Sequence, residues 1–298
     1  MVPGADTGAR MSLGSLSATL TRKSRSNFYY AFLTLPRARR DALYAVYAFC
    51  RTVDDVADLG HDPAAQRGEL ARWREDVARC FAPGAEPVHP IARQLKAAVT
   101  AYPIPRAALD AIIEGCAMDL ERVRYETAEE LEPYCYRVAS AVGLCCIEIF
   151  GYTDPRARQY AIDLGKALQL TNIMRDVGVD ARAGRVYLPQ RDLKDFGVSE
   201  DDLVEGRYGE PFVRLMVHQA VRARRFYAAA HASYPARDAR SLVAAEIMGR
   251  IYHALLEEIE RRRFAVFGER ITVPARRKVA IALRCWAGAR LRRNGAPA

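Results

Sequence analysis

The stretch ALYAVYAFCRTVDDVAD (residues 42–58) decides the fold class of this chain. Its apolar side chains recur every three or four residues, which is the period of an α-helix and not the alternation of a β-strand. The predicted helix ends in acidic residues, and Asp54 and Asp58 share one face because they are four residues apart. Like charges at this spacing repel each other, whereas a divalent cation held between them would make the interaction favourable.

A solvated acidic helix end is the simpler interpretation of the same residues. It explains Asp58 poorly, because acidic side chains near the C-terminus of a helix oppose the helix dipole. Arg51 lies one turn before Asp54 and Asp55, so the segment also carries a cation beside its carboxylates.

A second polar stripe lies in QLTNIMRDVGVD (residues 169–180). Gln169, Asn172, Asp176 and Asp180 are spaced by three, four and four residues, which places them on one face of a helix that is otherwise mainly apolar. The alternative is the polar face of an ordinary amphipathic helix. Carboxylate and amide oxygens are ligands that suit Mg²⁺, which usually shares the phosphate oxygens of its substrate. The stripe therefore favours a lined cavity.

Two acidic helices that face each other across a bundle could hold several Mg²⁺ ions. Metal ions and arginines together suit a polyanionic leaving group such as diphosphate, because they neutralise its charge as a C–O bond ionises. Arg137, Arg175 and Arg185 are candidate phosphate contacts. The sequence predicts this chemistry only if both acidic helices face one chamber.

The segment YCYRVASAVG (residues 134–143) places tyrosines before a run of small residues. Small side chains let helices approach closely or leave room for a ligand. A tyrosine ring can stabilise a carbocation, and its hydroxyl can relay a proton. Simple core packing explains the same residues, so Tyr134 becomes a catalytic candidate only together with the acidic stripes.

The helical period continues along most of the chain, and prolines lie where helices are expected to start or stop. Residues 181–198, with Gly184, Pro189 and Gly197, form the clearest non-helical stretch. We expect a single all-α domain of about ten helices over residues 21–293, preceded by a disordered extension over residues 1–20, in which Met11 is an alternative start. The prolines are Pro36, Pro63, Pro90, Pro105, Pro133, Pro155, Pro211 and Pro274.

Composition narrows the classes of protein. The 298 residues are 50% hydrophobic, yet the longest apolar run, Ala42–Cys50, is far shorter than the ~18 residues of a membrane-spanning helix. The N-terminus lacks the charged start and apolar core of a secretory signal. Seven cysteines without a CxxC pair are typical of buried thiols in a reducing compartment. These features predict a cytoplasmic protein.

The formal net charge is +9, and only five of the 45 basic residues are lysine. Arginine forks suit phosphate oxygens, so nucleic acid, an anionic membrane surface and phosphorylated small molecules are all candidate partners, although genomic codon bias also raises arginine content. A non-catalytic nucleic-acid binder is disfavoured, because aromatic residues are not interleaved with the basic clusters. Residues 276–293 predict a basic amphipathic helix that either contacts anionic lipid or closes the bundle.

Taken together, these segments resemble the squalene/phytoene synthases, which join two prenyl diphosphates head to head. The resemblance runs from about Ser24 to Trp286. It implies the all-α isoprenoid-synthase fold, a helical bundle in which both aspartate motifs face a central cavity. The segments that carry it are SNFYYAFLTLP (26–36), YAFCRTVDDVAD (47–58), YCYRVASAVG (134–143), LGKALQLTNIMRDVGVD (164–180), GRVYLPQRDL (184–193) and YHALLEEIERRRFAVFGERITV (252–273).

The resemblance also implies roles for individual residues. It implies that Asp54, Asp58, Asp176 and Asp180 bind several Mg²⁺ ions. It also implies that Tyr134 is a further catalytic residue. Some relatives carry His-Ser-Lys-Ser where this chain has Ser24-Arg25-Ser26-Asn27, so the cation is kept but shifted by one place. The implied diphosphate or substrate contacts are Arg25, Arg51, Gln169, Asn172, Arg175, Tyr252 and Arg270.

Within the family, residues 26–36 and 249–262 are most similar to bacterial presqualene diphosphate synthases of hopanoid biosynthesis. This similarity implies two farnesyl diphosphates per turnover, no NADPH, no nucleic-acid partner and, since the product is an amphiphilic C30 diphosphate, peripheral contact with the inner face of the membrane. A complete squalene synthase that uses NADPH, and a phytoene synthase that uses geranylgeranyl diphosphate, remain as alternatives. The absence of GxGxxG does not exclude NADPH, because this fold would not bind it through a Rossmann motif.

Overall fold

The computed structural model describes residues 31–32, 34–59, 62–121 and 124–291, which form twelve α-helices, one π-helical segment and one 3₁₀ turn. No β-strand occurs in these ranges, so the prediction of an all-α fold is confirmed. The predicted extension over residues 1–20 and the candidate Arg25 lie outside the described residues. The helices are α3 (Arg37–Leu59), α4 (Pro63–Phe81), α5 (Pro90–Ala101), α6 (Arg106–Glu121), α7 (Ala128–Cys135), η1 (Tyr136–Ser140), α8 (Ala141–Phe150), α9 (Arg156–Arg182), α10 (Gln190–Phe196), α11 (Glu200–Glu205), α12 (Glu210–Ser233), η2 (Ala236–Asp238), α13 (Val243–Arg261) and α14 (Ala275–Leu291).

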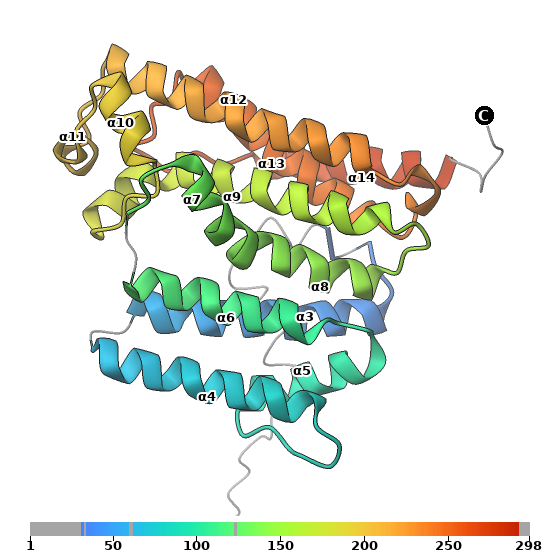
Figure 1. Ribbon diagram of the computed structural model, residues 1–298. Coiled ribbons are helices and arrows are strands. Elements are labelled where there is room, and N and C mark those ends of the chain that lie inside the picture. Colours follow the sequence, from blue (N-terminus) through green and yellow to red (C-terminus); the bar gives the residue numbers. More distant parts are fainter. Residues whose placement is uncertain (1–30, 33, 60–61, 122–123, 292–298) are drawn as a thin grey trace, which may run out of the picture.

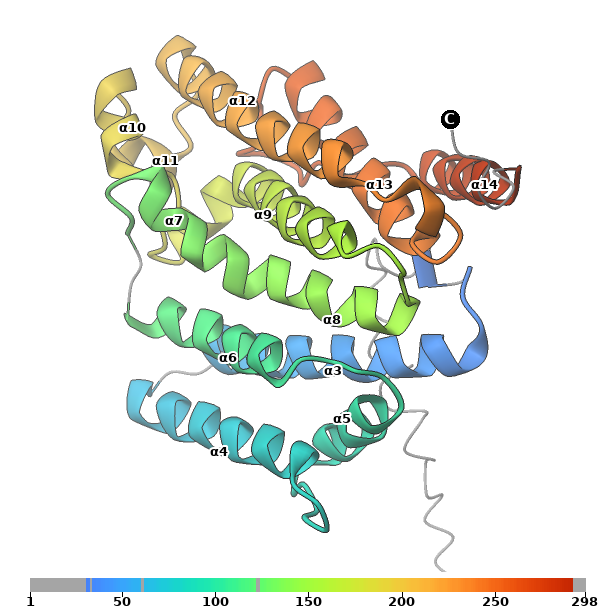
Figure 2. The same cartoon turned by 45° about the vertical axis from the view of Figure 1, so that its right-hand side comes forward.

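The helices are arranged in layers (Figures 1 and 2). Helices α3 and α6 lie side by side, with α4 and α5 below them at one end of the stack, and α12, α13 and α14 lie at the opposite end. Between them lie α7, α8 and α9, with α9 packed against α8, α12 and α13. Helix α3 packs against α5, α6 and α8. The two acidic helices therefore belong to different layers of one bundle.

Prolines start several helices as predicted. Pro63 and Pro90 are the first residues of α4 and α5, where a missing N–H costs nothing, and Pro211 is the second residue of α12. The side chains of Asp62 and His89 accept hydrogen bonds from the free backbone N–H groups of the first turns of α4 and α5. Local capping and proline placement thus fix where these helices begin.

Pro133 differs from its prediction, because it lies inside α7 and not at a helix end. Thr127 caps α7 instead, by accepting a hydrogen bond from Glu130 N at 3.3 Å. The backbone then becomes π-helical over η1 before α8 continues. A proline removes one backbone donor, and a π segment is a way to accommodate such a local defect.

The expected non-helical stretch over residues 181–198 is only partly correct. Helix α9 continues to Arg182, and α10 occupies most of the second half. Gly197 ends α10 in the left-handed conformation, with φ of 67°, so this glycine marks a helix end. The short helices α10 and α11 also explain why the expected count of about ten helices was too low for the described ranges.

Helices η1 and α9 approach each other closely. A Cβ on Gly165 would lie 2.5 Å from Ser140 Cα, so only glycine permits this contact. Ser140 Oγ donates to Ile162 O at 2.7 Å across the same junction. The close approach fixes α9 against η1, the segment that directly follows α7 and Tyr134.

One part of the described chain, Ala128–Phe150, is long and apolar enough to cross a membrane by length and composition, with a mean hydropathy of 1.2. That hydropathy is the mean over its most apolar 18 residues, 56% of which are buried in the fold. Within this stretch, η1 and α8 both pack against α6 and against α9. Its apolar character is therefore explained by its position in the middle of the bundle.

Candidate active site

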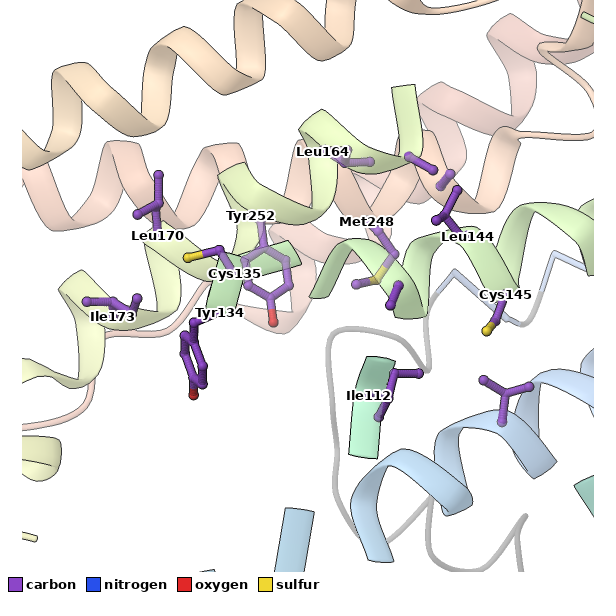
Figure 3. Packing of buried hydrophobic residues seen from close by; sticks show 14 of the residues in the cluster. Ile112, Tyr134, Cys135, Leu144, Cys145, Leu164, Leu170, Ile173, Met248 and Tyr252 are labelled. Atoms are coloured by element: carbon purple, nitrogen blue, oxygen red, sulfur yellow. The ribbon is translucent and has the colours of Figure 1, made fainter. Parts of the chain in front are cut away.

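A cavity of about 620 Å³ lies between the layers and is lined by α3, α6, α8, α9 and α13. The lining on α9 extends from Tyr160 to Asp180, which corresponds to roughly 30 Å at 1.5 Å per residue. Figure 3 shows Tyr134 and Tyr252 among the apolar side chains of this region. Charged lining residues come from the C-terminal parts of α3 and α9 and also from other elements, namely Asp119 of α6, Arg185, Arg270 and Lys278. Apolar lining residues include Leu43, Val46, Ile147, Phe150, Leu164, Ala245 and Met248.

Helix α3 contributes Arg51, Asp54 and Asp58 to the cavity. Arg51 lies 3.4 Å from Asp54 Oδ2 and 2.5 Å from Asp55 Oδ1. Burial, together with the nearby charge of Asp58, raises the pKa of Asp54 to about 6 despite the attraction of Arg51. Asp54 is therefore a carboxylate whose negative charge is only weakly compensated.

Asp58 is held from another part of the chain. Arg185, in the loop after α9, donates from Nη1 to Asp58 Oδ1 at 2.6 Å and from Nη2 to Ala57 O at 3.2 Å. The loop thus joins the end of α9 to the end of α3 and places Arg185 in the cavity wall.

Helix α9 contributes the second stripe. Asp176 accepts hydrogen bonds from Arg175 Nε at 2.8 Å and from Arg270 Nε and Nη2 at 3.1 and 3.0 Å. Burial acts to raise the pKa of Asp176, but these two arginines outweigh it and lower the pKa below its ordinary value. Asp180 lies one turn further, where burial and then the charge of Asp176 raise its pKa to about 7.

Sequence reasoning missed a fifth carboxylate of the site. Asp119 is buried on α6 and accepts hydrogen bonds from the hydroxyls of Tyr134 at 3.1 Å and Tyr187 at 2.7 Å. Burial raises its pKa to about 6. A signal was present in the sequence, because Ile112, Cys116 and Asp119 follow a helical period that puts an acid on an apolar face.

The carboxylates of the different helices influence one another. After burial and Asp176, the charges of Asp119 and Asp58 also contribute to the raised pKa of Asp180, while Arg185 opposes them. Asp58 likewise raises the pKa of Asp119. Repulsion of this kind requires proximity, so α3, α6 and α9 direct their acids towards one charged region of the cavity.

The donor set suits a cation that is shared with a phosphate ligand. Within the described residues, no three carboxylate, imidazole or thiol side chains lie close enough together to form a metal site by themselves. Mg²⁺ needs only one or two carboxylates when waters and substrate phosphates complete its shell. The Oδ1 atom of Asn172 is also buried in this wall, and it has no hydrogen-bond partner among the described residues. Because buried polar atoms are normally hydrogen-bonded, this oxygen is available to a bound ligand. The residues therefore fit Mg²⁺ bound together with diphosphate.

All site residues that the resemblance implies and that lie in the described ranges line this cavity, as does the candidate Arg185. Tyr252 of α13 and Tyr134 of α7 both appear in Figure 3. Arg137 does not line the cavity, because it donates to Glu114 Oε2 and to Pro133 O, both at 3.1 Å. The residues brought together are Asp54, Asp58, Asp176, Asp180, Tyr134, Arg51, Gln169, Asn172, Arg175, Tyr252 and Arg270.

Comparisons with known proteins agree with this geometry. The squalene/phytoene synthase family model matches residues 21–277. A phytoene synthase of Arthrospira platensis is 36% identical over 89% of each chain, and a presqualene diphosphate synthase of Rhodopseudomonas palustris is 35% identical over 87% of this chain and 92% of its own. Among solved structures, a ligand-bound dehydrosqualene synthase superposes with a TM-score of 0.83 at 29% identity, covering 94% of this chain and 97% of its own. A squalene synthase of Alicyclobacillus acidocaldarius gives 0.74 at 31% identity, covering 85% and 94%.

Proposed function

The chain belongs to the squalene/phytoene synthase family of prenyltransferases, and we propose that it condenses two farnesyl diphosphates head to head into presqualene diphosphate. The observation that carries this proposal is the convergence of acidic stripes from α3 and α9 on one charged region of a largely apolar cavity. Similarity to presqualene diphosphate synthases of two bacteria supports the choice of product.

In the proposed reaction, the C1–O bond of one farnesyl diphosphate breaks, and its electron pair leaves with diphosphate. The 2,3 double bond of the second molecule attacks C1 of the resulting allylic cation. Loss of a proton from that C1 closes a cyclopropane ring and gives presqualene diphosphate. One diphosphate and one proton are released in each turnover.

The charged region of the cavity serves the first step. Several Mg²⁺ ions, when bound, supply Lewis-acid charge that stabilises the departing diphosphate. Asp54, Asp58, Asp176 and Asp180 provide oxygen donors for them. Arginine forks in the same wall can bind phosphate oxygens in pairs, which both orients the leaving group and compensates its charge. These arginines are Arg51, Arg175, Arg185 and Arg270.

The apolar region serves the later steps, because an allylic cation reacts with water. Burial of a C15 chain is worth on the order of 10 kcal/mol before ordering costs, at ~0.8 kcal/mol per CH₂. That energy can hold both chains in a region from which water is excluded. Side chains such as Leu164 and Met248 supply this surface (Figure 3).

Two groups could accept the proton from C1. The released diphosphate is one. The other is Tyr134, whose hydroxyl donates to Asp119 Oδ2 at 3.1 Å. Burial raises the pKa of Tyr134, so the neutral phenol would have to take the substrate proton while its own passes to Asp119.

Product analysis by mass spectrometry tests the proposal. Purified full-length protein, farnesyl diphosphate and Mg²⁺ without reductant should give presqualene diphosphate, and EDTA should abolish the reaction. Formation of product at the normal rate in EDTA would contradict the metal-assisted mechanism. Squalene that appears only with NADPH would instead indicate a complete squalene synthase.

Phytoene synthesis is the second candidate, because a phytoene synthase is as similar to this chain as a presqualene diphosphate synthase is. Competition between farnesyl and geranylgeranyl diphosphate in one reaction separates the two. A kcat/KM at least tenfold higher for the C20 substrate, with phytoene as product, would favour the carotenoid function.

We also propose a cytoplasmic location with peripheral contact at the inner face of the membrane. The product of the condensation would carry a C30 hydrocarbon and a diphosphate, and such an amphiphile partitions into lipid. No nucleic-acid partner is expected.

A further inference from the structure

Helix α14 lies at the edge of the molecule, with α13 as its principal neighbour (Figure 2). Ala289 is the single residue of α14 that is buried, whereas Leu283 and Trp286 are 61% and 39% exposed. Apolar side chains that are exposed singly are ordinary, but a contiguous exposed patch of them marks an interaction surface. This helix therefore presents a surface that the other described elements leave exposed.

The exposed apolar residues of α14 form one stripe. Val279, Leu283 and Trp286 follow one another at intervals of four and three residues, which keeps them on a single face. Val279 is 45% exposed, so the stripe is open along several turns. Ile281, Ala282 and Cys285 of the same helix are partly buried and pack against the core. The helix is thus apolar on both its inner and its outer face.

Basic residues flank the outer stripe. Helix α14 carries five arginine and lysine residues and no acidic residue. Arg276 and Arg284 have no acidic partner among the described residues, and the Arg290 guanidinium lies 4.0 Å from the centroid of the Trp286 ring. A face of apolar side chains and a tryptophan, with arginines beside it, is the composition of an interfacial helix on anionic lipid.

The stripe begins beside the cavity. Lys278, in the first turn of α14, lines the cavity together with Ile271, Thr272 and Val273 of the preceding linker. One short segment therefore borders the site on one side and the exposed stripe on the other. A lipid bound to this face would lie next to the cavity wall.

We propose that the outer face of α14 docks the protein on the surface of an anionic lipid bilayer, with Val279, Leu283 and Trp286 inserted among the headgroups. The excess of positive charge on α14 favours anionic lipid over a second copy of this basic chain as the occupant. The proposal adds a surface to the proposed function and does not depend on the length of the prenyl substrate.

Vesicle sedimentation with the full chain tests this surface. Vesicles of phosphatidylcholine with 30% phosphatidylglycerol should bind the protein, while pure phosphatidylcholine should bind it roughly fivefold more weakly for each arginine that contacts the surface. Binding should fall in high salt. Leu283→Glu and Arg284→Glu should each lower the partition coefficient by about fivefold to tenfold.

Val217→Glu is a matched control, because Val217 is 47% exposed on α12 and the substitution introduces the same charge. It should leave vesicle binding within twofold of the wild type. Equal binding by Leu283→Glu and the wild type would overturn the proposal, since another surface would then be responsible.

Tryptophan fluorescence gives a second measurement. The chain has two tryptophans, and Trp73 is buried, so a blue shift on adding anionic vesicles should come from Trp286. The shift should disappear in Trp286→Phe. If iodide cannot quench Trp286 in the vesicle-free protein, or if Leu283→Glu only dissociates a dimer in sedimentation velocity, the occupant is protein and the proposal is wrong.

Activity distinguishes this proposal from the proposed function. Leu283 and Arg284 do not line the cavity, so their variants should turn over dispersed substrate at the wild-type rate. Normal turnover with lost vesicle binding supports the docking surface. Vesicle binding without any prenyltransferase activity would contradict the proposed function and leave the docking surface supported.

Discussion

Helices α3 and α9 carry acids at the same spacing but hold them differently. On α9, Asp176 receives two arginines, one from its own helix and one from the linker before α14, whereas Asp180 keeps a raised pKa. On α3, it is the second acid that is held, because Arg185 reaches Asp58 from the loop after α9, and Asp54 keeps the raised pKa. Each helix thus offers one compensated and one weakly compensated carboxylate, and both helices depend on arginines from elsewhere in the chain. Equal spacing in sequence does not mean equal electrostatics.

The largest expected effect comes from neutralising one acid on each helix. Asp54→Asn and Asp176→Asn should each lower kcat by roughly 10³-fold or more. Each variant loses a carboxylate that would hold the metal ions, and those ions would stabilise the leaving diphosphate. Helical content by circular dichroism should stay unchanged. Asp41→Asn, at the exposed N-terminal end of α3, is the control and should retain activity. Near-normal turnover in either site variant would mean that the two helices do not serve one site.

The arginines that hold the two helices should give the next largest effect. Arg270→Gln and Arg185→Gln each remove a guanidinium from one carboxylate and from the expected phosphate site, so kcat/KM should fall about 10-fold to 100-fold in steady-state assays. Arg137→Gln is the matched control, since Arg137 pairs with Glu114 outside the cavity. A loss in only one of the two variants would show that the helices are not equivalent in substrate binding.

Asp119 should give a smaller effect, because it touches the tyrosines and acts through them. We expect Asp119→Asn to lower kcat about tenfold with little change in KM, since it weakens the acceptor for the Tyr134 hydroxyl. The pH–rate profile should shift as well, which a purely structural role would not produce. Tyr187→Phe removes the other hydroxyl that donates to Asp119 and leaves Tyr134 in place. It therefore separates the effect of altered packing around Asp119 from the effect of proton transfer through Tyr134. An unchanged profile in Asp119→Asn would assign proton acceptance to diphosphate.

The smallest expected effect is on thermal stability, and it has opposite signs for Asp176 and Asp180 of α9. The lowered pKa of Asp176 means that its charge stabilises the fold above pH 3.8, and this stability is lost as the pH falls through the folded pKa. The raised pKa of Asp180 means that its charge destabilises the fold at pH 8, and the penalty is relieved as the pH falls from about 7 towards 4.

Calorimetry at pH 8 in EDTA checks both signs. Asp180→Asn should raise Tm and Asp176→Asn should lower it, each by roughly 2–4 °C for every kcal/mol of change in the free energy of unfolding. Asp41→Asn should leave Tm within a degree or so. If both site variants shift Tm in the same direction, the contrast between compensated and uncompensated acids is wrong.

Much of the site could be predicted from sequence, because helices turn spacing into position. The period of residues 42–58 and 169–180 sufficed to place each acidic pair on one face. Residues 181–198 and Pro133 were harder to assign, because short capped helices and a π segment depend on local hydrogen bonds that a periodicity does not reveal. Arg137 was also misjudged, since an arginine beside a motif can equally pair with a neighbouring helix, here through Glu114.

The sequence by itself determined the all-α fold and the two acidic stripes, since both follow from a local period of 3.6 residues. Only the tertiary structure decided that Asp119 joins these stripes from α6 and that Arg185 connects the end of α9 to Asp58. It also decided which acid on each helix is stabilised as a charge, because pKa depends on burial and on charges that lie far away along the chain. Contacts between residues 127 positions apart, such as Arg185 and Asp58, have no local signature in the sequence.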